Sequence, residues 1–134
     1  MPREPHRRDM AEEWLRHARS NLSLARHGRT PDVLLNHLCF ESHQAAEKAV
    51  KGVLVFRDIS FPYTHDLGVL LDLLEGSGES VPDAVWVAAP ILSPYAIHAR
   101  YPAFANPPGE DDYRRALEGA DAVVRWAEGV VHVG

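Results

Sequence analysis

A continuous stripe of apolar and small side chains in residues 31–57 constrains the fold more than any other feature of the sequence. At about 100° per residue, the stripe contains Leu35, Leu38, Cys39, Ser42, Ala45, Ala46, Ala49, Val50, Val53 and Phe56. Polar residues share the opposite face: His37, Glu41, Gln44, Lys48 and Lys51. Because alanines occupy the middle of the stripe, a neighbouring helix can approach closely. The segment is therefore predicted to be a helix whose apolar face is buried against other helices.

Two apolar residues, Phe40 and Val55, interrupt the polar face of this predicted helix. A second subunit could cover them. They could equally be scattered apolar residues on the surface, which need no partner. The sequence leaves both interpretations open.

The segments before residue 58 carry further helix signals. A first helix is indicated by apolar residues that recur every three or four positions: Met10, Trp14, Ala18, Leu22 and Ala25. Asp9 and Glu12 have the spacing of a capping box at its start, and Gly28 is a plausible end. Residues 1–8 are expected to be a flexible N-terminus. Thr30 and Pro31 are expected to begin the second helix.

The rest of the chain predicts three more helices. Thr64 can cap a short third helix that contains Leu67, Leu70, Leu71 and Leu74 and ends at residues 76–78. A fourth helix is expected to begin at Ser80 to Pro82 and to be interrupted at Pro90 and Pro94. Residues 101–109 contain three prolines and are expected to form a loop. The last helix begins with Glu110, Asp111 and Asp112, which suit the positive end of a helix dipole. Its predicted core face comprises Tyr113, Ala116, Leu117, Ala120, Val123, Val124 and Ala127.

These elements predict an all-α protein, an antiparallel bundle of about five helices in a single domain over residues 1–134. The single cysteine, Cys39, excludes an intrachain disulfide and fits a reducing, cytoplasmic location. No apolar run approaches the roughly 18 residues of a membrane span. The formal net charge of −5 means that the surface as a whole repels nucleic acid. Any nucleotide or RNA site must therefore be a local patch.

Three segments in register resemble the HEPN domain family. Residues 39–54 read CFESHQAAEKAVKGVL and resemble the second helix of that family. Thr64, His65, Asp66 and Leu67 follow, and then Tyr95 and residues 99–102 before the final helix. The resemblance runs from about residue 9 to residue 130. It implies a helical bundle related to nucleotidyltransferase substrate-binding subunits, usually a homodimer, associated with nucleotides or RNA and without a cofactor. Many such domains form toxin–antitoxin pairs with a separately encoded minimal nucleotidyltransferase.

Many HEPN domains are metal-independent ribonucleases in which four to six residues lie between an arginine and the histidine that follows it. This sequence departs from that pattern, because the corresponding positions after Arg100 are residues 105–107, none of which is histidine. His98 precedes the arginine instead. Arg125 and His132 have the spacing, but they lie at the end of the last helix. If the chain is a ribonuclease, the candidate catalytic residues are therefore Arg100 with His98 or His65.

Five residues are candidates for binding a nucleotide or RNA. Lys48 and Lys51 lie three residues apart on one helix face, where two cations could meet one phosphate. The planar guanidinium of Arg100 suits bidentate phosphate contact, and Tyr101 could stack on an unpaired base. His65 is expected at a helix start, which favours anions.

Each candidate also has a structural interpretation. The lysines could form an ordinary solvated face, and Arg100 could pair with a carboxylate such as Glu47. His65 could hydrogen-bond to the backbone, and Tyr101 could be a core residue whose hydroxyl is satisfied. Cys39 lies on the apolar stripe and is interpreted as a core residue rather than a nucleophile.

Metal binding is a further alternative, because His37 with Glu41, and His43 with Glu47, have the spacing that places two ligands on one helix face. No Glu-x-x-His motif of the kind found in di-iron bundles occurs in the sequence. No metal site is predicted.

Three hypotheses for function follow. The first is a nucleotide- or RNA-binding module, paired with a minimal nucleotidyltransferase. The second is a metal-independent ribonuclease toxin with a degenerate arginine–histidine site. The third is a non-catalytic structural or regulatory partner.

Overall fold

The computed structural model describes residues 4–97 and 107–133. Within these ranges the chain forms α1 (Glu4–His27), α2 (Leu35–Phe56), α3 (Leu67–Gly76), α4 (Asp83–Leu92), a short 3₁₀ helix (Ser93–Tyr95) and α5 (Glu110–Val133). No strand occurs in the described ranges. The prediction of an all-α bundle of about five helices is confirmed.

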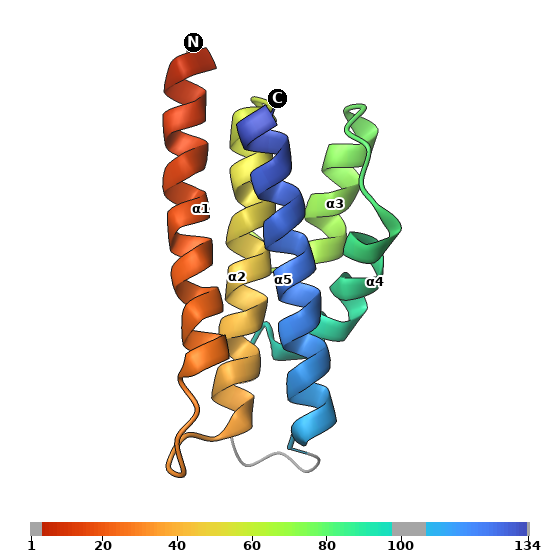
Figure 1. The fold of residues 1–134 in the computed structure, drawn as a ribbon. Helices are drawn as coiled ribbons and strands as arrows, with labels where there is room; N and C mark the ends of the chain where they lie inside the picture. Colours follow the sequence, from red (N-terminus) through yellow and green to blue (C-terminus); the bar gives the residue numbers. More distant parts are fainter. Residues whose placement is uncertain (1–3, 98–106, 134) are drawn as a thin grey trace.

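Three long helices stand side by side, and two short helices cover one flank of the group (Figure 1). α1 runs antiparallel to α2 and α5, whereas α3 and α4 pack beside the upper and middle parts of α2 and α5. The N- and C-termini lie at the same end of the molecule (Figure 1). α2 contacts α1, α3, α4 and α5 and is the central helix of the fold.

The stripe predicted for the second helix is buried almost completely. The alanines at positions 45, 46 and 49 have no exposed surface, and neither do Val50 and Val53. On the side that faces α1, Gly52 brings the two helices together, because a Cβ atom there would lie 3.2 Å from the Cβ of Trp14. Small residues on α2 therefore allow the close helix approach expected from the sequence.

Burial of α2 extends beyond the predicted apolar stripe. Asn36, His43, Glu47 and Lys51 are also buried. Lys51 was expected on an exposed face, but it is only 7% exposed. Lys51 is buried because the segment between α2 and α3 folds back over this part of the helix. Phe40 and Val55 are partly buried in the single chain.

Several helix boundaries differ from the predictions. α1 already includes residues 4–8, so Asp9 and Glu12 lie within the helix instead of capping it. α2 begins at Leu35 rather than at Pro31, because residues 31–33 form a turn. Asp66, not Thr64, caps α3, since its carboxylate accepts a hydrogen bond from the Val69 amide at 3.3 Å.

The fourth and fifth helices differ from the predictions less. Pro90 lies inside α4 instead of interrupting it, and Pro94 falls in the 3₁₀ helix that follows. α5 begins at Glu110 as predicted. Five positions of its predicted core face are buried, Ala116, Ala120, Val123, Val124 and Ala127, and Tyr113 and Leu117 are partly buried.

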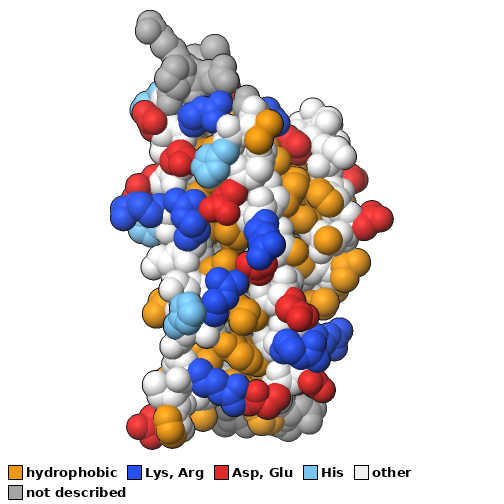
Figure 2. Space-filling view, in the orientation of Figure 1, with side chains coloured by type: hydrophobic (Ala, Val, Ile, Leu, Met, Phe, Trp, Pro, Cys, Tyr) orange, Lys and Arg blue, Asp and Glu red, His pale blue; other side chains and the backbone are white. Residues whose placement is uncertain are grey.

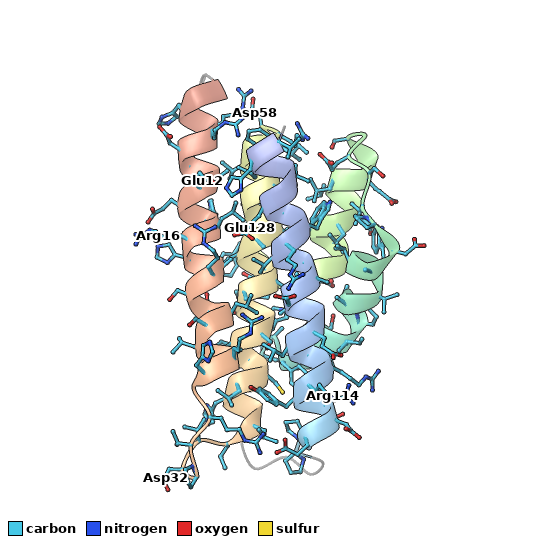
Figure 3. The ribbon with its side chains drawn as sticks, in the orientation of Figure 1. Glu12, Arg16, Asp32, Asp58, Arg114 and Glu128 are labelled. Carbon is cyan, nitrogen blue, oxygen red and sulfur yellow. The ribbon has the colours of Figure 1, made fainter. Side chains whose placement is uncertain are left out.

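Polar contacts join α1 to α5. Arg19 bonds to Glu128 at 2.7 Å, Arg26 to Asp121 at 2.9 Å, and His132 to Glu12 at 2.7 Å. Figure 3 labels Glu12 on α1 and Glu128 on α5, near the seam between these helices. Acidic and basic side chains are intermixed over this face, as Figure 2 shows, so neither charge predominates there. No helix in the described ranges is both long and apolar enough to cross a membrane.

Candidate functional site

The carboxylate of Glu47 organises a group of polar side chains where α2 meets the loop before α3. One oxygen, Oε2, accepts a hydrogen bond from the Lys51 ammonium at 2.8 Å. The other, Oε1, lies 2.9 Å from Nδ1 of His65. Glu47 is 4% exposed, so both of its oxygens are satisfied away from bulk water. The pairing with Lys51 follows from helix geometry, because residues four apart lie on one face.

His43 ties the loop to the helix one turn before Glu47. Its side chain is fully buried, and its Nε2 lies 3.1 Å from the backbone oxygen of His65. Since a carbonyl oxygen only accepts hydrogen bonds, Nε2 is the donor, and in the neutral ring Nδ1 is therefore the unprotonated nitrogen. Nδ1 lies 3.8 Å from Glu47 and has no hydrogen-bond partner among the described residues. Burial lowers the pKa of His43, although the nearby Glu47 carboxylate opposes this effect.

Two aromatic side chains from the same loop complete the group. The Lys51 ammonium lies 5.7 Å from the ring centroid of Phe61. The Tyr63 ring meets the His65 imidazole edge to face at 5.4 Å, and Tyr63 is 91% exposed. We call the residues Glu47, Lys51, Phe61, Tyr63 and His65 the Glu47 cluster.

His65 is the side chain of the Glu47 cluster best suited to chemistry. Its Nδ1 donates to the Glu47 carboxylate, and its side chain is 40% exposed. A carboxylate on one imidazole nitrogen fixes the orientation of the ring and leaves Nε2 to act on another molecule. The neutral ring can accept a proton at Nε2, and the protonated ring can donate a hydrogen bond to a phosphate.

The structure separates the two lysines that were predicted to meet one phosphate. Lys51 points to Glu47, whereas the Lys48 ammonium donates to Oδ1 of Asn21 on α1 at 2.8 Å. The Asn21 amide in turn donates to Glu41 at 2.6 Å. In this structure the two ammonium groups therefore have different acceptors, Asn21 for Lys48 and Glu47 for Lys51.

Three of the sequence candidates, His98, Arg100 and Tyr101, lie outside the described residues. The carboxylate of Glu47, considered as a partner for Arg100, is bonded to Lys51 and His65. No group of three or more potential metal ligands occurs in the ranges that the structure describes. Cys39 is buried, and burial raises the pKa of its thiol to about 11, so the group is not a thiolate at neutral pH.

Sequence reasoning missed the central position of Glu47 and the contribution of Phe61 and Tyr63. A signal for Glu47 was present, because a glutamate among buried alanines with histidine four residues before and lysine four residues after is unusual in a core helix. No comparable local signal marks Phe61 or Tyr63, since their positions depend on how the loop folds over α2.

Comparison with known proteins identifies the family to which this fold belongs. The HEPN domain family model matches residues 11–130, and the chain belongs to this family. The fold is similar to a crystal structure of ST0689, described as an archaeal HEPN homologue, with a TM-score of 0.71 and 28% identity over 90% of this chain and 97% of that chain.

A second solved structure, TT1696 from Thermus thermophilus, matches with a TM-score of 0.72 and 31% identity over the same shares of the two chains. The comparison with curated proteins gives no match. Membership of the HEPN family makes this chain, in general terms, a nucleotide- or RNA-related module.

The burial of His43 predicts a pH-dependent stability that a variant can isolate. Unfolding exposes His43 and restores its usual pKa of about 6.5, so in mildly acidic solution the unfolded chain binds a proton that the folded chain resists. The contribution of His43 to stability is therefore lost as pH falls through about 6.5 toward the lower folded pKa. Urea unfolding at pH 7.5, 6.5 and 5.5 should show a steeper loss of stability toward acid pH for the wild type than for His43→Gln.

His37→Gln, on the exposed start of α2, is the control and should lose stability with pH as the wild type does. Parallel plots of stability against pH for the wild type and His43→Gln would contradict this account.

Proposed function

We propose that this chain is a nucleotide- or RNA-binding HEPN module and that the Glu47 cluster is part of its binding surface. The observation that carries the proposal is an imidazole held by a buried carboxylate beside an almost fully exposed aromatic ring. His65 and Tyr63 supply these groups, and their rings lie 5.4 Å apart.

The chemistry of the Glu47 cluster suits an unpaired nucleotide. An exposed tyrosine ring offers a face on which a base can stack, and stacking of this kind tolerates any base. The adjacent His65 can donate to a phosphate when protonated. Glu47 and Lys51 neutralise each other in the buried part of the cluster, so the exposed groups determine what binds. Lys48, Arg100 and Tyr101 remain proposed contributors to nucleotide or RNA binding.

The proposal includes a separately encoded minimal nucleotidyltransferase as partner, in a toxin–antitoxin-like pair in the cytoplasm, and assembly as a homodimer. The resemblance of the sequence to HEPN domains encoded beside such enzymes supports the partner. The partly buried Phe40 and Val55 on α2 offer apolar area to a second copy. A net charge of −5 also favours a restricted contact with nucleic acid over a general one.

Binding of a fluorescently labelled single-stranded RNA, measured by anisotropy, tests this function. We expect affinity to fall as salt rises, because phosphate contacts release counterions. Tyr63→Ala should weaken binding about tenfold, the loss of one stacked base, and His65→Ala should also weaken it. Tyr63 is almost wholly exposed, so its removal should not disturb folding.

His37→Ala on the exposed start of α2 is the matched control and should bind as the wild type does. Wild-type affinity in both cluster variants would refute the assignment of the site. No binding of RNA or nucleotide by the wild type would favour a structural or regulatory partner.

A metal-independent ribonuclease is the second candidate, and the geometry of His65 favours it. An imidazole oriented by a carboxylate can take the proton from a ribose 2′-hydroxyl, and Arg100 could stabilise charge on the phosphate. RNA cleavage in EDTA should then be lost in both His65→Ala and Arg100→Ala. Cleavage that persists in His65→Ala would exclude this mechanism.

A further inference from the structure

A hollow opens between α1 and α2, apart from the Glu47 cluster. It has a volume of about 400 Å³ and is lined by Met10, Glu13, Trp14, His17 and Lys48. Small-molecule sites are commonly clefts of about 300–1,000 Å³ with apolar walls and a few polar groups. This α1–α2 cleft therefore has the size of a small-ligand site.

The apolar wall of the α1–α2 cleft packs closely against α2 on one side. Trp14 is partly buried, and its Cβ is held against Gly52 of α2, since an added Cβ at Gly52 would approach it to 3.2 Å. Met10 lies beside it with 40% of its surface exposed. An indole with a flexible thioether next to it suits a flat aromatic ligand.

The cation of the α1–α2 cleft is held in place by a chain of hydrogen bonds. Lys48 donates one N–H to Asn21 at 2.8 Å, and Asn21 donates to Glu41 at 2.6 Å. An ammonium has three N–H donors, so two remain for an anionic group of a ligand. The chain has two lysines, and Lys51 is paired with the buried carboxylate of Glu47. Lys48 is thus the lysine that can receive a ligand.

An acceptor lies on the α1 side of the same cleft. The Glu13 carboxylate accepts a hydrogen bond from the Arg16 guanidinium at 2.7 Å and lies 3.2 Å from Nε2 of His17. The hydrogen bond from Arg16 lowers the pKa of Glu13, so this carboxylate is ionised at neutral pH. An ionised carboxylate accepts hydrogen bonds and does not donate them.

We propose that the α1–α2 cleft is a second binding site, for a nucleobase that carries an amino group and is linked to a phosphate. The base lies against Trp14 and Met10, the phosphate meets Lys48, and the amino group donates to Glu13. The nucleotide can be a free nucleoside monophosphate or one residue of an RNA strand. This site is separate from the Glu47 cluster and does not depend on it.

Nuclear magnetic resonance of the three tryptophan indole N–H groups tests the proposal, with Trp14→Phe used to assign the signal of Trp14. Adenosine monophosphate should shift the Trp14 signal to saturation and leave Trp86 and Trp126 unchanged. Three probes should each bind at least about tenfold more weakly than adenosine monophosphate. Adenosine lacks the phosphate, inorganic phosphate lacks the base, and uridine monophosphate lacks the amino group. A six-nucleotide oligoadenylate shows whether RNA also enters the cleft.

Variants separate this inference from the proposed function. Lys48→Gln should weaken adenosine monophosphate at Trp14 about tenfold, whereas His65→Ala in the Glu47 cluster should leave its affinity unchanged. The inference is overturned if adenosine monophosphate gives no saturable Trp14 shift at millimolar concentration, or if Lys48→Gln binds as tightly as wild type. RNA affinity lost in Tyr63→Ala would still support the Glu47 cluster in either case.

Discussion

Replacing Glu47 with alanine is expected to lower the free energy of unfolding by about 3–5 kcal/mol. The change leaves the Lys51 ammonium, which is 7% exposed, without its anionic partner. It also removes the acceptor of His65 and so loosens the loop before α3. A charge left unpaired in a protein interior costs far more than the loss of a surface pair. Urea unfolding monitored by circular dichroism measures the difference.

Glu13→Ala is the matched control for this prediction. Glu13 also pairs with a basic residue on its own helix, Arg16 at 2.7 Å, but both side chains are more than half exposed. Its loss should cost far less stability than the loss of Glu47, because exposed ion pairs are screened by water. The double variant Glu47→Gln with Lys51→Met removes both charges and should recover part of the lost stability. Equal effects of Glu47→Ala and Glu13→Ala would mean that the Glu47 pair is not buried in solution.

Gly52→Leu is expected to destabilise the fold by about 1–3 kcal/mol through overpacking. A Cβ at this position would lie 3.2 Å from the Trp14 Cβ and 3.4 Å from the backbone oxygen of Ala11, so α1 must move away from α2. The displacement should also change the fluorescence of Trp14 in the folded state. Thermal unfolding and the emission spectrum report the two effects.

Gly129→Leu on α5 is the control for Gly52→Leu, because, apart from its chain neighbours and the nearby backbone of α5, no described atom lies within 4 Å of a Cβ built there. Glycine costs a helix about 1 kcal/mol relative to a good helix former, so this variant should be neutral or slightly stabilising. If Gly52→Leu were as stable as Gly129→Leu, the close contact between α1 and α2 would be contradicted.

The sequence pattern was sufficient for the framework of the fold. The apolar stripes of α2 and α5 are buried as predicted, because a period of 3.6 residues identifies the core face of a helix directly. The predicted helix boundaries were less accurate. Thr30 and Pro31 have the residue types of a helix start, but α2 begins at Leu35, and Thr64 has the residue type of a cap, but Asp66 caps α3. Cap identity depends on backbone conformation, which residue type indicates only weakly.

The environment of the candidate site was harder to predict, for a physical reason. Helical periodicity placed Lys51 and Lys48 together on a polar face, but it could not show that the loop carrying Phe61 and His65 covers Lys51. It also could not show that Asn21 of α1 holds Lys48. Both outcomes depend on contacts between residues far apart in the sequence. Such contacts leave no periodic signal.

Ultraviolet cross-linking tests most directly whether nucleic acid contacts the Glu47 cluster. The protein is irradiated with a single-stranded RNA that contains 4-thiouridine and digested with protease, and its peptides are sequenced by mass spectrometry. We predict a cross-link at Tyr63 or His65 that is lost in Tyr63→Ala and in competition with unlabelled RNA. Cross-links confined to the outer surfaces of α4 and α5, with residues 61–65 unmodified, would contradict the claim.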